Sequence, residues 1–215
     1  MQVVLEEDSR ATVICLCASL GGALCARQIA TVASGAHLHL INITVGDGIE
    51  QSLVSTCTGS GSVSAVDWVF RASKADTQKL SVRNVFTADH GGGEITMKGV
   101  AEDRAHVAAS GMIDIGLHGK GTHTYLTQNV LMLDPTAKVD VIPGLEIKTN
   151  DVKASHSATV SRVTADDLFY FGSRGIAEEE ARQMYIEGFL GEILERIGSC
   201  DALDRARQAL LGAEC

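Results

Sequence analysis

From residue 3 to about 163, apolar and polar residues alternate in short runs, a period that is typical of β-strands. The runs are rich in Val, Ile and Thr, and clusters of Gly, Asp, Asn or Ser separate most of them. No apolar stripe of helical length appears here, although residues 100–109 are ambiguous. The pattern predicts strands over residues 12–17, 37–45, 52–58, 63–70, 80–86, 94–100, 112–117, 125–133, 139–142 and 145–148.

The order of these runs leaves two architectures open. Asp47-Gly48 is the only strong two-residue hairpin signal among them. One architecture is an antiparallel sandwich or barrel. The other is a β-helix, in which the strands of successive turns stack and Gly or polar residues mark the corners. No strict short repeat is present, so an irregular β-helix is favoured over a regular hexapeptide type.

Helical signals replace the strand alternation at Thr164. Thr164 is a suitable N-cap, and the acidic residues after it favour the positive end of a helix dipole. We expect this helix to stop near Gly172 and Gly175. The chain therefore divides into a β core over residues 1–163 and a C-terminal helical segment over residues 164–215.

A second helix is predicted to begin near Ala177 and to end at Gly198, and residues 201–211 favour a third, short helix. Along the second helix, apolar residues recur every fourth position, and their neighbours widen the stripe. The stripe consists of Tyr185, Ile186, Phe189, Leu190, Ile193, Leu194 and Ile197.

Composition excludes several classes of protein. The chain has 215 residues, of which 45% are hydrophobic and 21% charged, so wholesale disorder is excluded. A net charge of −9 and only 4% aromatic residues argue against a nucleic-acid binder. The apolar run over residues 13–25 is too short for a bilayer and follows acidic residues, unlike a signal peptide. Six cysteines without a CxxC pair fit a reduced, cytoplasmic protein with no membrane or nucleic-acid partner.

The sequence lacks a nucleotide-binding motif but contains residues that could bind a metal ion. No GxxxxGK[ST] segment occurs, so we expect this chain to bind no nucleotide itself. Residues two apart on a strand share a face, and two such pairs are compatible with metal ligation, although ordinary packing or surface roles are the favoured explanation. The pairs are Cys15 with Cys17 and His37 with His39, and a small metal-binding β protein would bring the histidines together with His118 or His123.

A β-helix enzyme acting on polysaccharides is a second alternative. Asp140, Glu146 and Asp151 could supply paired carboxylates on successive strands. Sugar rings favour aromatic platforms, however, and this stretch has almost none.

The most specific stretch of sequence lies between residues 143 and 197. It resembles the SufB/SufD family of iron–sulfur cluster assembly proteins, and is most similar to SufD-like members. The resemblance is looser back to about residue 97, and the chain is shorter than the usual member, which fits a reduced member or a core fragment. The matching segments are Pro143, Leu145-Glu146-Ile147, Asp151-Val152-Lys153, Ser155-His156, Ala158-Thr159-Val160, Leu168-Phe169-Tyr170, Ser173-Arg174-Gly175-Ile176 and Glu178-Glu179-Glu180-Ala181.

The resemblance implies a right-handed parallel β-helix with a C-terminal α-helical segment. It implies a non-enzymatic scaffold that pairs through the β-helix with itself or with a SufB/SufD-like subunit. A SufC-like ABC ATPase would dock on the C-terminal helices and bind the nucleotide. The docking residues predicted here are Phe169, Tyr185, Phe189 and Ile193. The implied cargo is a transient iron–sulfur cluster, built at the paired interface and shared with the partner subunit.

His156 matches the histidine that the family places at this interface as a cluster or iron ligand. Neutral imidazole suits iron, and a histidine at a strand edge can face a partner chain. The neighbouring family cysteines are absent, since Ala154 stands at one position and Gln128 or Asn129 at the other. Serines also flank the histidine where SufB-like members carry carboxylates. We therefore expect the sulfur ligands to come from a partner subunit or from a cysteine elsewhere, such as Cys57.

Overall fold

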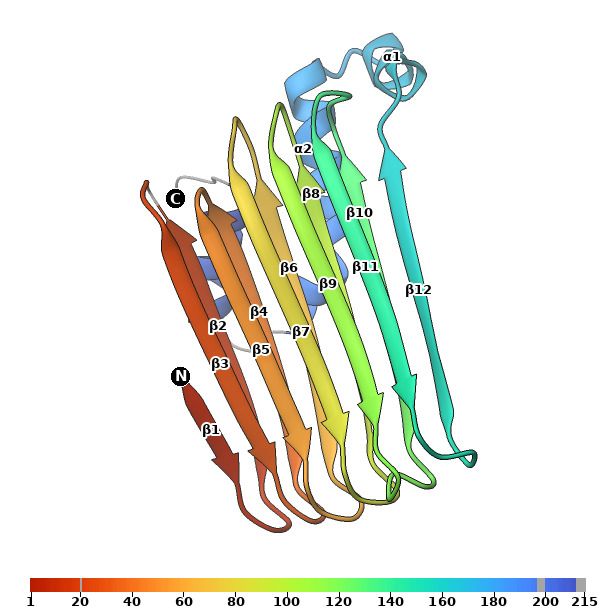
Figure 1. Cartoon of the computed structure of the whole chain (residues 1–215). Coiled ribbons are helices and arrows are strands. Elements are labelled where there is room, and N and C mark those ends of the chain that lie inside the picture. The colour runs from red at the N-terminus through yellow and green to blue at the C-terminus, as the bar shows by residue number, and fades with distance from the viewer. Residues whose placement is uncertain (20, 197–199, 212–215) are drawn as a thin grey trace.

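The computed structural model describes residues 1–19, 21–196 and 200–211, and this part of the chain forms two parallel six-stranded sheets (Figure 1). Odd-numbered strands form sheet A and even-numbered strands form sheet B. The chain passes from one sheet to the other at every corner and advances by one strand per turn, with a right-handed sense (Figure 1). The predicted parallel β-helix with C-terminal helices is confirmed.

The elements have the following bounds. Sheet A contains β1 (Gln2–Leu5), β3 (Leu24–Val32), β5 (Ile49–Cys57), β7 (Thr77–Phe86), β9 (His106–Ile115) and β11 (Lys138–Ile147). Sheet B contains β2 (Arg10–Ser19), β4 (His37–Gly46), β6 (Val63–Ala72), β8 (Gly92–Ala101), β10 (His123–Met132) and β12 (Lys153–Arg162). The helices are α1 (Ala165–Ser173), α2 (Glu178–Glu195) and α3 (Cys200–Leu211).

The repeat of the solenoid is visible in the strand register. His37 pairs with Val63, Val63 with Gly92, Gly92 with His123, and His123 with Lys153. One turn therefore takes about 30 residues, within the range of solenoid repeats. Stacking in register aligns the inward-facing residues of successive turns in columns, so the interior is one continuous core.

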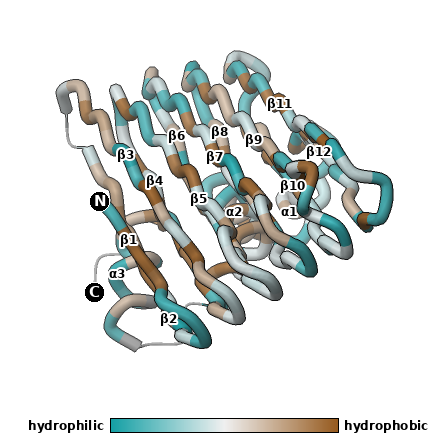
Figure 2. Tube along the Cα trace, turned by 60° about the horizontal axis from the view of Figure 1, so that its bottom comes forward, coloured by the Kyte–Doolittle hydropathy of each residue, from teal (hydrophilic) through white to brown (hydrophobic). Residues whose placement is uncertain are grey.

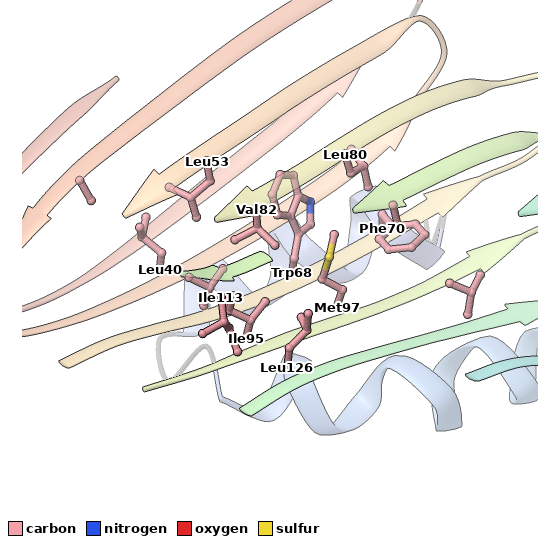
Figure 3. Close-up of a cluster of buried hydrophobic side chains, with 14 of the residues drawn as sticks. Leu40, Leu53, Trp68, Phe70, Leu80, Val82, Ile95, Met97, Ile113 and Leu126 are labelled. Carbon is pink, nitrogen blue, oxygen red and sulfur yellow. The ribbon is translucent and has the colours of Figure 1, made fainter. Parts of the chain in front are cut away.

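The interior between the sheets is filled by large apolar side chains (Figure 3). Leu38, Leu40, Leu53, Trp68, Phe70, Leu80, Phe86, Ile95, Ile113 and Leu126 are all at most 1% exposed. Packing is tight enough to require a glycine. A Cβ atom at Gly99 would lie 1.9 Å from Cε2 of Phe70, so the Phe70 ring fits only because Gly99 has no side chain.

A polar layer crosses the interior near the N-terminal turns. The amides of Gln28 and Asn42 exchange two hydrogen bonds of 2.9 Å. The Thr44 hydroxyl donates to Gln51 at 2.8 Å and accepts from the indole N–H of Trp68 at 2.9 Å. These five buried side chains satisfy one another, which keeps the layer compatible with the apolar core around it.

α2 and α3 cover the outer face of sheet B, and α1 lies beyond the end of β12 (Figure 1). Ile41, Ile43, Val69, Val100 and Leu131 point outward from that sheet and pack against the helices in a second hydrophobic cluster. From the helices, the fully buried members are Ile186, Leu190, Ile193, Leu194, Ala206 and Leu210. Hydrophobic stretches follow the strands, while many of the corners are hydrophilic (Figure 2).

Several sequence expectations are corrected by the structure. Strands β1, β3 and β12 were not predicted, and the ambiguous residues 100–109 form the end of β8, a corner and the start of β9. Asp47-Gly48 is a corner between the two sheets rather than a hairpin turn. Its Asp47 carboxylate accepts the backbone N–H of Thr77 from the next turn at 2.8 Å, so the aspartate joins stacked corners.

Pro143 does not break β11, although the sequence predicted two short strands around it. Pro143 pairs with Gly111 of β9, and β11 is the last strand of sheet A. A proline lacks an N–H to donate, and an edge strand tolerates that loss because it has only one neighbour.

Candidate functional site

β12 ends sheet B and is paired on one side only within the described part of the chain. Its ten residues follow β10 in unbroken register, from Lys153 opposite His123 to Arg162 opposite Met132. In sheet A, β11 is the corresponding edge strand. The last turn of the solenoid therefore presents two free strand edges, with backbone N–H and C=O groups available for pairing.

His156 lies on this last turn. Its register partner is Leu126, which ends a buried column that continues through Ile95, Val66 and Leu40. Residues in register point to the same side of a sheet, so the imidazole continues this column at the open end of the solenoid. His156 is exposed, and its ring has no hydrogen-bond or ion-pair partner among the described residues. Both ring nitrogens are therefore free for a ligand.

Among the described residues, the positions next to His156 on β12 and on its neighbour β10 carry no thiol. Ala154 and Ala158 flank it on the same side of β12. Gln128, in register with Ala158, is fully buried and donates its amide N–H to the carbonyl of Ala109 at 3.2 Å. Within residues 1–19, 21–196 and 200–211, no three side chains of His, Cys, Asp or Glu gather as a metal site requires. Of the described side chains around it on this turn, His156 is the one imidazole that faces the open end.

Cys57 cannot complete that ligand set within one chain. It ends β5, and the register leads from Cys57 through Phe86 and Ile115 to the edge strand β11. Three strand spacings amount to about 14 Å, far beyond a shared coordination sphere. Burial raises the pKa of the Cys57 thiol to about 11, which disfavours the thiolate that metals bind. The suggestion that Cys57 supplies sulfur next to His156 is therefore wrong.

α1 follows β12 directly and is well capped. The Thr164 hydroxyl accepts the backbone N–H of Asp167, and the Asp167 carboxylate accepts the backbone N–H of Thr164 at 2.8 Å. The Thr164 hydroxyl, which donates to the Asp167 carboxylate at 2.7 Å, and the Thr164 backbone N–H together lower the pKa of Asp167. On the outer side of α1, Phe169 and Tyr170 are 76% and 58% exposed. The helix contacts α2 through Phe171, whose ring centroid lies 5.5 Å from that of Tyr185.

The four predicted docking residues occupy three different environments. Phe169 is exposed, and Tyr185 and Phe189 are partly buried against the sheet B cluster. Lys98 lies over the Phe189 ring, with Nζ 5.7 Å from its centroid. Ile193 is fully buried against sheet B. The structure therefore gives Ile193 a packing role and corrects its prediction as a docking residue.

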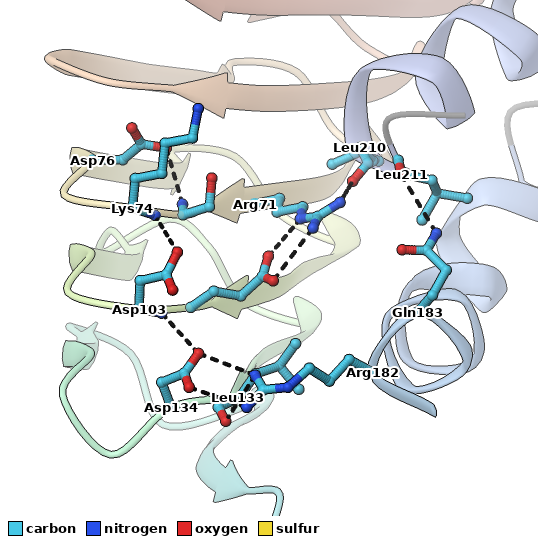
Figure 4. A network of polar contacts seen from close by, with 12 residues as sticks. Arg71, Lys74, Asp76, Asp103, Leu133, Asp134, Arg182, Gln183, Leu210 and Leu211 are labelled. Atoms are coloured by element: carbon cyan, nitrogen blue, oxygen red, sulfur yellow. Dashed lines mark hydrogen bonds and ion pairs between the residues drawn. The ribbon is translucent and has the colours of Figure 1, made fainter. Parts of the chain in front are cut away.

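Two arginines tie the helices to the corners of the solenoid (Figure 4). Arg182 of α2 contacts Asp134 at 3.1 Å in the turn between β10 and β11. Arg71 of β6 pairs with Glu102 and donates to the carbonyl of Leu210 in α3 at 2.7 Å. Partial burial disfavours the charged form of Asp134, but hydrogen bonds from Asp103 N–H and from the guanidinium outweigh it and lower its pKa. The helices are thus fixed by charge as well as by apolar packing.

The metal-binding alternative does not fit this geometry. His37 and His123 lie in one row of sheet B but three strands apart, or about 14 Å. His39 instead pairs with Asp67 at 2.8 Å, and Asp67 also binds Arg196 at 2.8 Å. The convergence of His37 and His39 with His123 that this alternative requires is therefore not formed.

The carboxylates considered for polysaccharide cleavage are also dispersed. Asp140 and Glu146 are six residues apart on one strand, which is about 20 Å. Glycosidase pairs are at most about 9.5 Å apart. Asp140 lies 3.0 Å from His106, and Glu146 lies 2.9 Å from Lys148. Asp140 and Glu146 are therefore too far apart to act together as a catalytic pair.

None of the helices in the described part of the chain is long and apolar enough to cross a membrane. Sequence reasoning missed the two arginine contacts to the corners, because nothing in a single chain relates Asp134 to Arg182 or Arg71 to Leu210. It also missed the direction of His156, which follows only from the register of β12 with β10.

Comparisons with known proteins agree with this geometry. A family model for the SufBD core domain of SUF system FeS cluster assembly matches residues 1–189. The chain is 38% identical over 100 residues to the iron-sulfur cluster assembly protein SufD of Escherichia coli (strain K12), covering 46% of this chain and 24% of that protein. A SufBD family protein of Mycobacterium leprae is 27% identical over 179 residues, covering 83% of this chain and 21% of the relative.

A SufBD family protein of Staphylococcus saprophyticus is 30% identical over 132 residues, covering 61% of this chain and 28% of the relative. The alignments thus span about a quarter of the length of these curated relatives. The resemblance drawn from residues 143–197 is confirmed, and the chain belongs to the SufBD core family of the SUF iron–sulfur cluster assembly system.

Proposed function

We propose that this chain is a non-enzymatic scaffold subunit of an iron–sulfur cluster assembly complex. It pairs through the free edges of β11 and β12, and a cluster forms transiently at the paired edge with His156 as one ligand. The observation that carries the proposal is the unpartnered imidazole on a free strand edge at the open end of the solenoid. The cytoplasmic location expected from the sequence remains a prediction.

The free edges are suited to pairing. The free edge of a ten-residue strand is a template for another strand, and soluble proteins usually protect such edges. Three large apolar side chains lie exposed on these edge strands: Ile142 (63%) and Ile147 (41%) on β11, and Val160 (46%) on β12. Their burial by a second subunit would add a hydrophobic contribution to the backbone hydrogen bonds.

Pairing also addresses the incomplete ligand set. One chain offers a single imidazole on its last turn, whereas an iron–sulfur cluster needs several ligands, mostly thiolates. A second copy would add another His156, and a related subunit would add thiolates of its own. We therefore treat the cluster as cargo that is shared across the paired edges.

We further propose that a SufC-like ABC ATPase binds the exposed aromatic side of α1. On α1, Phe169 and Tyr170 are 76% and 58% exposed, and Met184 on the following helix α2 is 46% exposed. Because α1 begins three residues after the end of β12, a displacement of this helix would be transmitted to the strand that carries His156. α2 reaches the adjacent corner through Arg182 and Asp134. Nucleotide-driven motion of the partner would thus act on the edge where the cluster is built.

The cluster site is tested by anaerobic reconstitution followed by absorbance spectroscopy. His156→Ala should lower the cluster yield while circular dichroism shows an unchanged fold. The matched control is His106→Ala, because His106 is also exposed but lies on the outer face of sheet A. A normal cluster yield with His156→Ala would return this histidine to a merely structural role.

The pairing edge is tested by analytical ultracentrifugation. Val160→Lys places a charge on the free edge and should shift dimers toward monomers. Leu117→Lys is the control, because Leu117 is 72% exposed in the turn before β10. Equal dimer fractions in both variants would argue against pairing through β12.

ATPase docking is tested by co-purification with the SufC-like protein. Phe169→Asp should abolish the association, and Leu117→Asp should retain it. Retention by a folded Phe169→Asp variant would remove α1 from the docking surface.

A further inference from the structure

At the opposite end of the solenoid, two thiols and a thioether lie together. Cys15 and Cys17 are two apart on β2, the first strand of sheet B, and both are half-buried. Their register partners are the buried Asn42 and Thr44, so both thiols belong to the inward side of the strand. Cys15 Sγ lies 3.6 Å from Met1 Sδ. We propose that Cys15 and Cys17, assisted by Met1, bind a soft monovalent metal ion, Cu(I).

The donor atoms select this class of ion. Thiolate and thioether sulfurs prefer Cu(I), whereas zinc favours four ligands in a tetrahedron. No third His, Cys, Asp or Glu joins this pair within the described residues, so a tetrahedral zinc or iron site is not formed. Two thiolates and one thioether suit an ion of low coordination number. Binding would displace the two thiol protons to solvent without any change of oxidation state.

The spacing favours a metal bridge over a disulfide. Residues two apart on a strand have Cα atoms about 6.6 Å apart. That separation is near the upper limit for a disulfide, whose Cα atoms usually lie about 5.5–6 Å apart. Two metal–sulfur bonds of about 2.3 Å each bring the sulfurs only to about 4.6 Å of one another. The pair can therefore hold an ion without the closer approach that a direct S–S bond demands.

The polar layer of the interior forms the floor of this site. Burial raises the pKa of the Cys15 thiol, and a hydrogen bond with the Gln28 side chain opposes that rise. Burial and the neighbouring Cys15 raise the pKa of Cys17, so the metal ion itself must displace both thiol protons when it binds. Gln28 is itself fixed by its paired hydrogen bonds to Asn42. A rigid amide that faces a sulfur is the kind of supporting contact that orients metal ligands.

The experiment is an anaerobic titration of the reduced, metal-free protein with Cu(I) in competition with a chromogenic chelator. The wild-type protein should withdraw one Cu(I) per chain from the chelator. Cys15→Ser and Cys17→Ser should each weaken this binding by more than about 100-fold, since outer contacts alone contribute about 10–100-fold. A variant with Cys25→Ser, Cys200→Ser and Cys215→Ser should bind as the wild type does.

Failure of the wild type to withdraw Cu(I), or unchanged binding by folded Cys15→Ser protein, would overturn the proposal. So would equal uptake of Zn(II) with the same dependence on both cysteines. Thermal unfolding of each apo variant establishes whether it is folded, and Cys17→Ser provides a second variant if Cys15→Ser is unstable. The titration requires neither an ATPase nor a cluster, so its result is independent of the function proposed above.

Discussion

The apolar stripe of α2 packs on the chain's own sheet, and this assignment can be tested at Ile193. Ile193 is fully buried between α2 and sheet B, whereas Phe169 on α1 is 76% exposed. Ile193→Ala removes three carbon atoms, worth roughly 2.4 kcal/mol at about 0.8 kcal/mol per buried methylene. A residual cavity brings the expected cost to about 3 kcal/mol, within the usual range of about 2–5 kcal/mol. Phe169→Ala should cost less than about 0.5 kcal/mol.

Thermal unfolding measures this difference. For a chain of this size, 1 kcal/mol shifts the melting temperature by about 2–4 °C, so Ile193→Ala should lower it by about 6–12 °C. Trp68, the only tryptophan, is fully buried in the solenoid and reports on the core by fluorescence, while circular dichroism follows the helices. A loss of helical signal before the Trp68 transition would show that the helices detach first. A shift under about 2 °C, or equal shifts in both variants, would refute the packing role of Ile193.

Three further predictions follow from single contacts. Gly99→Ala should destabilise the protein by about 1–3 kcal/mol in urea unfolding, because the added methyl overlaps the Phe70 ring. The pKa of Asp134 is lowered from 3.8, so its contribution to stability is present above that value and is lost as the pH falls through the lower folded pKa. Asp134→Asn should therefore flatten the acid limb of a pH–stability profile, and an unchanged limb would contradict this. Cys57, with a pKa raised to about 11, should react with a thiol reagent far more slowly than the exposed Cys25, as mass spectrometry of alkylated peptides would reveal.

The strands that sequence reasoning found and missed differ for a physical reason. Strands within the solenoid body whose outer face is open, such as β5 and β7, bury one face and alternate clearly. β3 inverts that pattern, because polar Gln28 points into the interior and Ile29 is exposed. β12 has few apolar residues because it lies at the open end with no turn above it. Alternation therefore predicts a strand only where the interior is apolar and covered.

The candidate site was only partly predictable. His156 was identified through a family resemblance, and its position on a free edge depends on a register that joins residues 30 apart. The stripe on α2 was recognised correctly as apolar, but periodicity does not say which surface covers it. The structure assigns Ile193 to the chain's own sheet and leaves Phe169 on the outside. To distinguish a residue that packs on the chain's own sheet from one that is exposed to a partner, one must know which strands point apolar side chains outward, as Ile41 and Val69 do.

The stacking of turns in register has a consequence for how such a chain can change in length. Each strand pairs only with those one turn before and one turn after it, so the solenoid behaves as a linear array of coupled units. Removing about 30 residues between equivalent points, such as Val63 and Gly92, joins surfaces that already fit one another. Removing about half a turn would instead place a strand of one sheet at a position that belongs to the other sheet. The side chains that face inward from that strand would then point outward. Insertions and deletions should therefore be tolerated in whole turns, while both ends keep their separate chemistry.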